Sequence, residues 1–299
     1  MAETRDTIEG AYDYIVVGAG AAGCAVASRL SEDPKTRVLL IEAGGKDNWI
    51  WFHIPVGYLF AIGNPRSDWL YRTEAEPGLN GRSLAYPRGK ALGGSTAINA
   101  MIAMRGQREN YDHWRQLGLA GWGWEDVLPI YRRMEDHYLG DTPVHGAGGP
   151  WKVERPRTSW AILDAVRAAA IEMGVPATED YNSGDNEGVC YFQVNQHRGR
   201  RWSAARGYLA PAKNRPNLRV LTRAQTDGVI LQDGKAVGVR GRRADGGAFE
   251  ARATGEVILS AGAIGSVEIL QRSGVGPGDW LQAAGAPVIV ERPGVGRNL

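Results

Sequence analysis

The sequence has few cysteines, little excess charge and no long apolar run, and each shortage argues against a class of protein. Its two cysteines, Cys24 and Cys190, stand in no CxxC or Cys/His spacing, which disfavours a disulfide-built fold or a zinc site and favours a reducing compartment. The 35 basic and 33 acidic residues nearly cancel, so we expect neither nucleic acid nor an anionic membrane as a partner. No stretch approaches the roughly 20 apolar residues of a transmembrane segment. The polar residues 1–10 contain no export signal, so we expect a cytoplasmic protein.

What the chain does contain is enough apolar residues for a large core and one informative glycine pattern. With 299 residues, 43% of them apolar, we expect about two domains. An apolar strand at residues 14–17 leads into a glycine turn and then into a helix of small residues. Gly18 permits a tight turn, Gly20 lets the backbone approach a pyrophosphate, and Gly23 lets the helix lie close to the sheet. The pattern predicts a dinucleotide site at the helix N-terminus, where unpaired amides favour phosphate.

An acidic residue completes this pattern. Glu42 follows a second apolar strand, Val38–Ile41, about 20 residues after the glycines, where a carboxylate can accept hydrogen bonds from an adenosine ribose. A carboxylate at this place also disfavours the 2′-phosphate of NADP. The alternative is an ordinary glycine turn of an α/β protein. The dinucleotide interpretation is favoured because strand, helix, second strand and acid all stand in the order that it requires.

The rest of the chain shows weaker patterns. Apolar periodicity predicts helices over residues 121–135 and 160–173. One face of the second helix carries Ile162, Ala165, Val166, Ala169 and Met173. Residues 216–239 and 248–259 are typical of antiparallel strands. A second strand–turn–helix unit is expected over residues 257–272.

Two further segments allow more than one interpretation. Residues 44–88 are rich in aromatic side chains, which either line or cover a site or pack a core beneath a long loop. Arg198, Arg200 and Arg201 are interpreted as a solvated face rather than as an anion site, because runs of charge are usually solvated. No internal repeat is evident.

Two long motifs give a resemblance to a known family. Residues 89–112 read GKALGGSTAINAMIAMRGQRENYD, which is similar at every position to the first signature of the glucose–methanol–choline (GMC) oxidoreductases. Residues 262–276, GAIGSVEILQRSGVG, are similar to the second signature, except that Val267 replaces proline or serine. Shorter matches are His145-Gly146 with Gly149-Pro150, the run GRRWSAARGYL at 199–209, and the final GVGRNL. The resemblance covers residues 12–299.

The resemblance implies both a fold and a division into domains. The fold would be α/β, with a Rossmann-like FAD-binding domain that contains a parallel sheet and a β-meander, plus part of a substrate domain with an antiparallel sheet. Residues 1–150 and 205–299 would form the two segments of the FAD-binding domain. Residues 151–204 would be the partial substrate domain, and the family's C-terminal half would be absent.

The resemblance also implies FAD as the cofactor and assigns the residues that hold it. Gly18, Gly20, Ala21 and Gly23 would hold the pyrophosphate, Glu42 with Ala43 the adenosine ribose, and the main chain at Thr226 the adenine. The flavin end would lie along two segments, Leu92, Gly93, Gly94 and Ser95, and Asn99, Ala100, Met101 and Ile102. Paired glycines suit this role because they let backbone amides approach a flat ring. In members with covalent flavin a histidine stands at the place of Ile98, so we expect non-covalent FAD here.

The implied activity is oxidation of an alcohol or polyol to an aldehyde or ketone by hydride transfer to flavin N5, with a separate electron acceptor. Such a reaction needs a base for the hydroxyl proton. The five histidines, His53, His113, His137, His145 and His197, all stand outside the family's catalytic motif. We therefore assign no catalytic residue and no metal ligand. We expect that the chain stops before the catalytic histidine and is inactive alone, the C-terminal half being supplied by the rest of the gene or by another chain.

Other functions stay open at this stage. The chain could be a non-catalytic FAD-binding fragment or one half of a split protein, because no base is assigned. A less favoured alternative is a relative of the fatty-acid photodecarboxylases, which resemble the same family. An NAD-dependent dehydrogenase fits the glycine pattern alone but not the two signatures.

Overall fold

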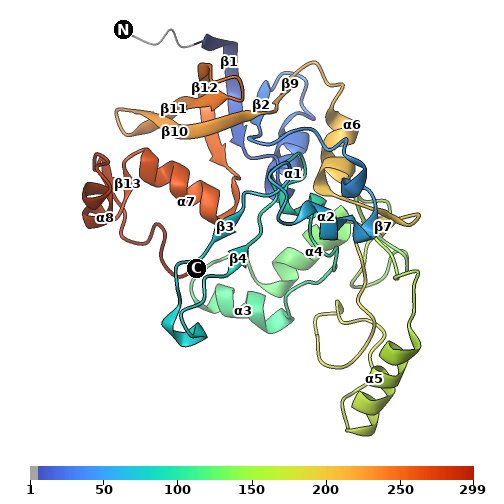
Figure 1. Cartoon of the computed structure of the whole chain (residues 1–299). Helices are drawn as coiled ribbons and strands as arrows, with labels where there is room; N and C mark the ends of the chain where they lie inside the picture. The colour runs from blue at the N-terminus through green and yellow to red at the C-terminus, as the bar shows by residue number, and fades with distance from the viewer. Residues whose placement is uncertain (1–5) are drawn as a thin grey trace. The chain divides into compact units, whose positions relative to one another are not determined.

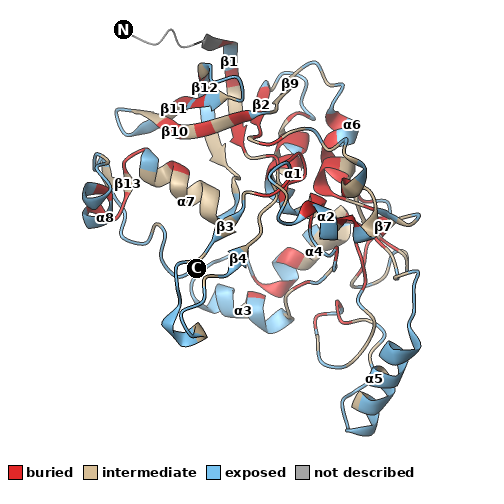
Figure 2. Cartoon of the chain, viewed as in Figure 1, coloured by how far each residue is buried: buried red, intermediate tan, exposed pale blue. Residues whose placement is uncertain are grey.

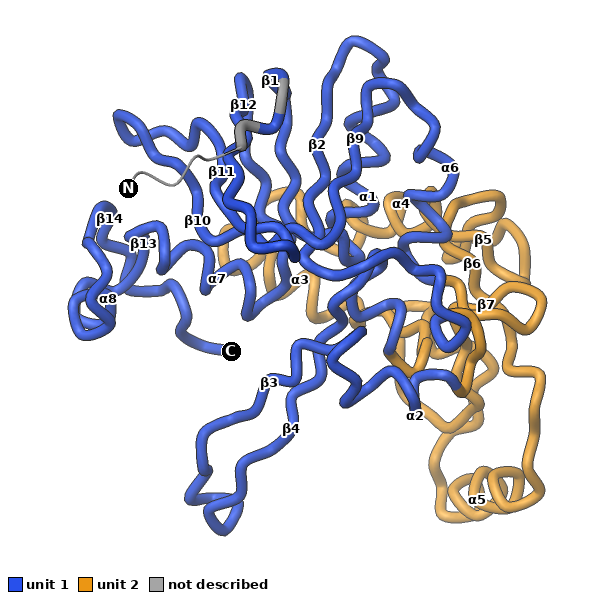
Figure 3. Tube along the Cα trace, turned by 45° about the horizontal axis from the view of Figure 1, so that its top comes forward, with its two compact units in different colours: residues 1–52, 57–98, 203–299 blue, residues 53–56, 99–202 orange. Residues whose placement is uncertain are grey.

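Residues 6–299 are described by the computed structural model, so half of the polar N-terminal stretch lies outside the described residues. The chain divides into two units (Figure 3). Unit 1 comprises Met1–Phe52, Gly57–Ile98 and Ser203–Leu299, and unit 2 comprises His53–Val56 and Asn99–Trp202. The domain boundaries expected at residues 150 and 204 stay a proposal. No helix among residues 6–299 has both the length and the apolar character of a membrane span.

Unit 1 contains a six-stranded sheet with the strand order β10-β11-β12-β1-β2-β9 (Figure 1). Its strands are β1 Asp6–Val17, β2 Val38–Ile41, β9 Leu218–Leu221, β10 Ala224–Gln232, β11 Lys235–Arg243 and β12 Ala248–Leu259. β12, β1, β2 and β9 are parallel neighbours, and β10, β11 and β12 form an antiparallel meander. The α/β fold with a parallel sheet and a meander is thereby confirmed. One detail was wrong, because β9, expected among the antiparallel strands, pairs in parallel with β2.

The parallel strands bring the two strand–turn–helix units together. α1 (Ala21–Leu30) follows β1, and α7 (Gly262–Arg272) follows β12. All four residues of β2 are buried, as is typical of a strand covered on both faces. In the sheet, Val17 stands opposite both Leu259 of β12 and Ile41 of β2. The carboxyl ends of three strands therefore meet at one edge, which is where open α/β sheets bind their ligands.

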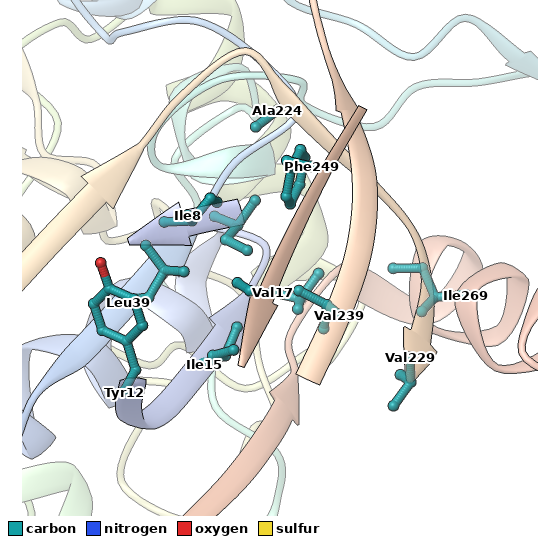
Figure 4. Packing of buried hydrophobic residues seen from close by; sticks show 12 residues of the cluster. Ile8, Tyr12, Ile15, Val17, Leu39, Ala224, Val229, Val239, Phe249 and Ile269 are labelled. Carbon is teal, nitrogen blue, oxygen red and sulfur yellow. The ribbon is translucent and has the colours of Figure 1, made fainter. Parts of the chain in front are cut away.

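The core of unit 1 is formed by apolar side chains from these strands and from α7, shown in Figure 4. The cluster comprises Ile8, Tyr12, Ile15, Val17, Leu39, Ile41, Ala224, Val229, Val239, Phe249, Ala251 and Ile269. Full burial of one larger apolar side chain contributes roughly 1.5–3 kcal/mol. The cluster joins the parallel and the antiparallel strands, so it holds the edge that carries the glycine turn in place.

The remaining elements of unit 1 are short. They are η1 Ile50–Phe52, α2 Tyr58–Ala61, β3 Tyr71–Arg72, η3 Pro77–Leu79, β4 Ala85–Tyr86, η4 Gly94–Ala97, η5 Ala205–Leu209, α6 Ala210–Ala212, β13 Val275–Gly276, α8 Gly278–Ala283 and β14 Val290–Glu291; η2 Pro55–Gly57 begins in unit 2. β3 pairs with β4, and the two extend as an arm from unit 1 (Figure 3). Among the aromatic residues, Phe52 is buried beside Ala61 and Ile98, whereas Phe60 is half exposed. At least part of this segment packs a small core.

Unit 2 has two short strand pairs and three helices. β5 (Glu135–His137) and β6 (Trp151–Val153) are parallel, whereas β7 (Gln196–His197) and β8 (Arg200–Arg201) are antiparallel. The helices are α3 Arg108–Gln116, α4 Trp124–Met134 and α5 Ala161–Glu172, so both helices expected from periodicity are confirmed. No residue of α5 is buried, and its apolar face is exposed in the described chain (Figure 2).

We predict that Gly23→Ala destabilises unit 1 while a matched change does not. A Cβ on Gly23 would overlap the backbone oxygen of Gly18, and relieving such an overlap costs about 1–3 kcal/mol. Gly78→Ala is the control, because a Cβ there meets nothing within 4 Å. Urea unfolding measures both variants. A Gly23→Ala midpoint equal to that of the wild type would show that α1 can move away from the turn.

Candidate cofactor site

The turn after β1 is formed by backbone in contact with backbone. Gly18 has a φ of +93°, and a Cβ there would lie 2.6 Å from the backbone oxygen of Ser260, at the end of β12. The amide of Gly18 donates to Ile41 O at 2.8 Å, which ties the turn to β2. Gly20 is the N-cap of α1, and no side chain caps this helix end. The turn therefore directs the N-terminus of α1 at the carboxyl edge of the sheet, the arrangement that suits a pyrophosphate.

A second glycine turn lies against the first. The amide of Gly93 donates to Ala19 O at 2.8 Å, and a Cβ on Gly94 would lie 2.7 Å from Gly20 Cα. Gly93 and Gly94 both have positive φ, at +93° and +52°. A Cβ on Gly20 itself would meet only Gly94 Cα, at 3.9 Å. Two stretches of backbone without side chains thus face one another in unit 1, and this cradle fits a phosphate-bearing cofactor that is held by backbone amides.

Glu42 is buried at the end of β2 and is already engaged with the backbone. Its Oε2 accepts from the amide of Ala19 at 2.8 Å, and its Oε1 accepts from Gly44 at 2.8 Å. Burial raises the pKa of Glu42 to about 7, although these two hydrogen bonds favour the charged form. Each oxygen keeps a second lone pair. The carboxylate therefore braces the turn, and its contact with a ribose, like that of Ala43, stays a prediction.

The segment after the second glycine turn is held by the 199–209 motif. Thr96 Oγ1 donates to Gly93 O at 2.5 Å and accepts from the amide of Ala204 at 2.9 Å. Ser95 Oγ accepts from the amide of Gly89 at 3.1 Å, and Leu92 is buried. Sequence reasoning missed Thr96, because its signal is only a hydroxyl inside the first signature. The two motifs together fix the conformation of the paired glycines.

Asn99, Ala100, Met101 and Ile102 belong to unit 2, so their place along the flavin stays a prediction. Asn99 is held by Arg201, whose Nη1 donates to Asn99 O at 2.6 Å and to Asn99 Oδ1 at 3.0 Å. The same Oδ1 accepts from the amide of Met101, which has a φ of +64°. Arg201 is fully buried, which corrects its interpretation as part of a solvated face. Arg198 and Arg200 are exposed as expected.

Thr226 lies on β10 and is 7% exposed. Its Oγ1 is buried and has no hydrogen-bond partner among the described residues. The side chain is on the same face as Ala224, which belongs to the apolar core. The hydroxyl is therefore left unsatisfied in an apolar setting, and the expected adenine contact through the main chain does not depend on it.

The fold and the two glycine turns define a dinucleotide-binding α/β protein. The family model described as GMC oxidoreductase matches residues 12–299, and the chain belongs to this family. GMC oxidoreductases are FAD-binding flavoproteins, which confirms FAD as the cofactor of the family.

Relatives and solved structures agree with this membership. The chain is 42% identical to the mitochondrial choline dehydrogenase of Homo sapiens, over 99% of this chain and 50% of the human protein. It is 42% identical to the oxygen-dependent choline dehydrogenase of Rhizobium rhizogenes (strain K84 / ATCC BAA-868), over 96% of this chain and 52% of that protein. The chain thus spans about half the length of these relatives.

Among solved structures, pyridoxine 4-oxidase from Mesorbium loti superimposes with a TM-score of 0.91 at 36% identity, over 94% of this chain and 55% of the other. An FAD-dependent oxidoreductase from Chaetomium thermophilum gives a TM-score of 0.88 at 30% identity, over 95% of this chain and 51% of the other. The α/β fold is therefore shared with FAD enzymes.

We predict that Gly20→Ala removes flavin binding but leaves the fold intact. The added methyl meets only ordinary contacts within the chain, yet it occupies the side from which a pyrophosphate approaches. We expect FAD affinity to fall at least about tenfold, or ~1.4 kcal/mol, with an unchanged urea midpoint. Gly78→Ala serves again as the control. Full retention of FAD in Gly20→Ala would place the phosphates elsewhere.

We predict that Thr226→Val stabilises the protein by about 1 kcal/mol, because it replaces an unsatisfied buried hydroxyl by a methyl of the same shape. FAD affinity should not change. Thr254→Val is the control, because Thr254 is exposed and its hydroxyl already donates to Tyr12 O at 3.2 Å, so removing that hydroxyl should bring no gain in stability. Urea unfolding and an FAD titration provide the two readouts. Loss of FAD affinity in Thr226→Val would mean that the hydroxyl contacts the cofactor.

Proposed function

We propose that this chain is the FAD-binding portion of an enzyme that oxidises the CH–OH group of a small alcohol to an aldehyde or ketone. The observation that carries this proposal is the pair of facing glycine turns, Gly18–Gly20 and Gly93–Gly94, in a member of the GMC oxidoreductase family. When bound, FAD accepts the hydride equivalent from the alcohol carbon and later passes the electrons to an acceptor.

The chain's own residues would bind and orient the cofactor. The amides around Gly20 and the N-terminus of α1 hold negative charge, and Glu42 fixes the turn that presents them. Thr96 holds the second glycine turn in place. Because Ile98 has no group that can form a bond to flavin, we propose that FAD is held without a covalent link.

The proton on the alcohol oxygen needs a separate base. We assign that role to none of the histidines of this chain. His145 has both ring nitrogens within hydrogen-bond distance of carboxylates, and the ring of His137 is stacked against it, so neither is placed to receive a substrate proton. We propose that the base belongs to the part of the whole protein that the chain does not include.

Choline is the first substrate to test, because relatives at 42% identity are named choline dehydrogenases. A solved relative at 36% identity is a pyridoxine oxidase, so the proposal is for a small alcohol in general rather than for choline alone. Because these relatives of one family are named for different substrates, we propose that specificity is set by residues other than those that hold the cofactor.

We predict that the complete gene product, loaded with FAD and kept without oxygen, loses its yellow flavin absorbance when a substrate alcohol is added. Choline, pyridoxine and benzyl alcohol are tested in turn. The control for choline is its O-methyl ether, which has the same cation but no hydroxyl proton to remove.

Reduction by an alcohol and not by its ether would support the proposal. If FAD stays bound and oxidised with every alcohol, the proposal fails. Release of carbon dioxide from a fatty acid under blue light would then identify a photodecarboxylase, and its absence would favour a non-catalytic flavin protein.

A further inference from the structure

The histidine of the HG…GP motif lies in a buried cluster of charges inside unit 2. His145 is 1% exposed. Its Nδ1 is 2.8 Å from Glu135 Oε2, and its Nε2 is 2.9 Å from Asp180 Oδ2. Arg105 completes the cluster, with Nη2 donating to the same Glu135 oxygen at 2.6 Å. Arg105, Glu135 and His145 are buried and Asp180 is partly exposed, so four ionisable side chains meet largely out of contact with water.

Both carboxylates that face His145 are ionised. Burial opposes their charge, but it is outweighed by hydrogen bonds and nearby charges together, from His145 and Arg105 at Glu135 and from His145, Asn182 and Gln193 at Asp180. The pKa of Glu135 is therefore lowered, and that of Asp180 falls to about 2. Glu135 also faces Arg105, and Asp180 Oδ1 accepts from the amide of Asn182 at 2.9 Å and from Gln193 Nε2 at 3.0 Å. An ionised carboxylate only accepts hydrogen bonds. Each ring nitrogen of His145 faces one of these acceptors and can bond to it only by carrying a proton. Arg105 Nη2 also lies 3.4 Å from Nδ1, where it shares the Glu135 oxygen with the ring.

The same residues have the spacing of a metal centre, but their geometry does not suit one. One ligand atom each from Glu135, His137 and His145 lies within 4.8 Å of the others. The rings of His137 and His145 are stacked, however, with centroids 3.6 Å apart and planes inclined by 3°. Nitrogen lone pairs lie in the ring plane, so two parallel rings cannot both direct them at one ion about 2.1 Å away. Arg105 and His145 moreover already bond to Oε2 of Glu135.

We propose that His145 is an imidazolium at and somewhat above neutral pH, a buried cation that clamps β5 to the segment carrying Asp180, rather than a base or a metal ligand. The clamp balances its charges, with Arg105 and His145 against Glu135 and Asp180. His137, stacked on His145, stays neutral, because its Nδ1 accepts from the amide of Leu139 at 3.3 Å. Burial, followed by the charge of His145, lowers the pKa of His137.

The clamp explains why the HG…GP motif has glycine at two positions, Gly146 and Gly149. A Cβ on Gly146 would overlap the backbone oxygen of Arg132, and one on Gly149 would overlap the backbone at Met134 and Glu135. The amide of Gly149 donates to Glu135 O at 3.0 Å, and Gly146 O accepts from the amide of His137 at 2.9 Å. The loop can therefore lie directly on β5 and bring His145 onto Glu135. The motif specifies a position for a charge, which explains its spacing without any catalytic role.

The clamp gives unit 2 a defined dependence on pH. Hydrogen bonds to Asp180 and Glu135 raise the pKa of His145, although burial opposes this. The stabilisation that protonated His145 contributes is complete below the unfolded histidine pKa of about 6.5. It is lost as the pH rises through the higher pKa that His145 has in the folded protein. The stabilisation that Asp180 and Glu135 contribute is lost on the acid side, as the pH falls through their lowered pKa values. His137 also destabilises the fold at acid pH, when its ring becomes protonated. The guanidinium of Arg105 also faces the cluster and lies above the Tyr131 ring.

The direct test is the protonation state of His145 in the FAD-loaded complete protein, labelled with ¹⁵N at histidine. At pH 8, about 1.5 units above the ordinary histidine pKa, long-range proton–nitrogen spectra should show one histidine with two protonated ring nitrogens. The signal is assigned by its absence in His145→Gln or, if that variant does not fold, by elimination with the other four histidines. One bare ring nitrogen on His145 at pH 8 would overturn the proposal.

A second readout separates the clamp from a metal site. His145→Gln should lower the melting temperature on the order of 10 °C near pH 6 and by less at alkaline pH, because the wild-type clamp weakens there. His113→Gln, at an exposed position of α3, is the matched control and should change neither value. Addition of zinc should leave the wild-type melting temperature unchanged. If zinc raises the melting temperature of the wild type but not that of His145→Gln, the cluster is a metal centre and the proposal of an imidazolium is contradicted. Because neither test depends on alcohol oxidation, failure of the proposed function would leave this inference standing.

Discussion

Contact between backbone and backbone at the carboxyl edge of the sheet is the constraint on which unit 1 depends. Gly18 touches Ser260, Gly23 touches the Gly18 carbonyl, and Gly94 touches Gly20. A single Cβ at Gly18, Gly23 or Gly94 would push the elements apart, so the site is built by leaving side chains out. What remains is a set of amides that can approach a phosphate or a flat ring closely. The cofactor role that we propose for these turns uses the same feature that holds the fold together.

Unit 2 uses the opposite device, in which buried charges fix the chain. Arg105 and His145 face Glu135 and Asp180, and the buried Arg201 holds Asn99 through both its backbone and its side-chain oxygen. Removing one partner from such a group leaves an uncompensated buried charge, which is strongly destabilising. In these two groups charge therefore serves to position segments of the chain, and His145 needs no catalytic explanation.

Local patterns made part of this structure predictable. Val38–Ile41 is a strand with the bounds that the sequence suggested, because a short unbroken apolar run has few other solutions. The glycine turns and Glu42 could also be placed, since their spacing reflects close approach and a strand end. The exposure of the apolar face of α5 could not be predicted, because an amphipathic pattern shows that a face is apolar but not what covers it. Arg201 was misplaced because burial of a charge depends on distant acceptors such as Asn99 O, which no local pattern reveals.

We propose that the facing glycine turns of unit 1 hold FAD, and a binding titration is the decisive test. The complete protein, stripped of flavin, is titrated separately with FAD and with NAD, and heat and flavin fluorescence are followed. The account predicts one FAD bound per chain and much weaker binding of NAD. Tight binding of NAD with no binding of FAD would contradict it, because the same cradle would then serve a nicotinamide cofactor.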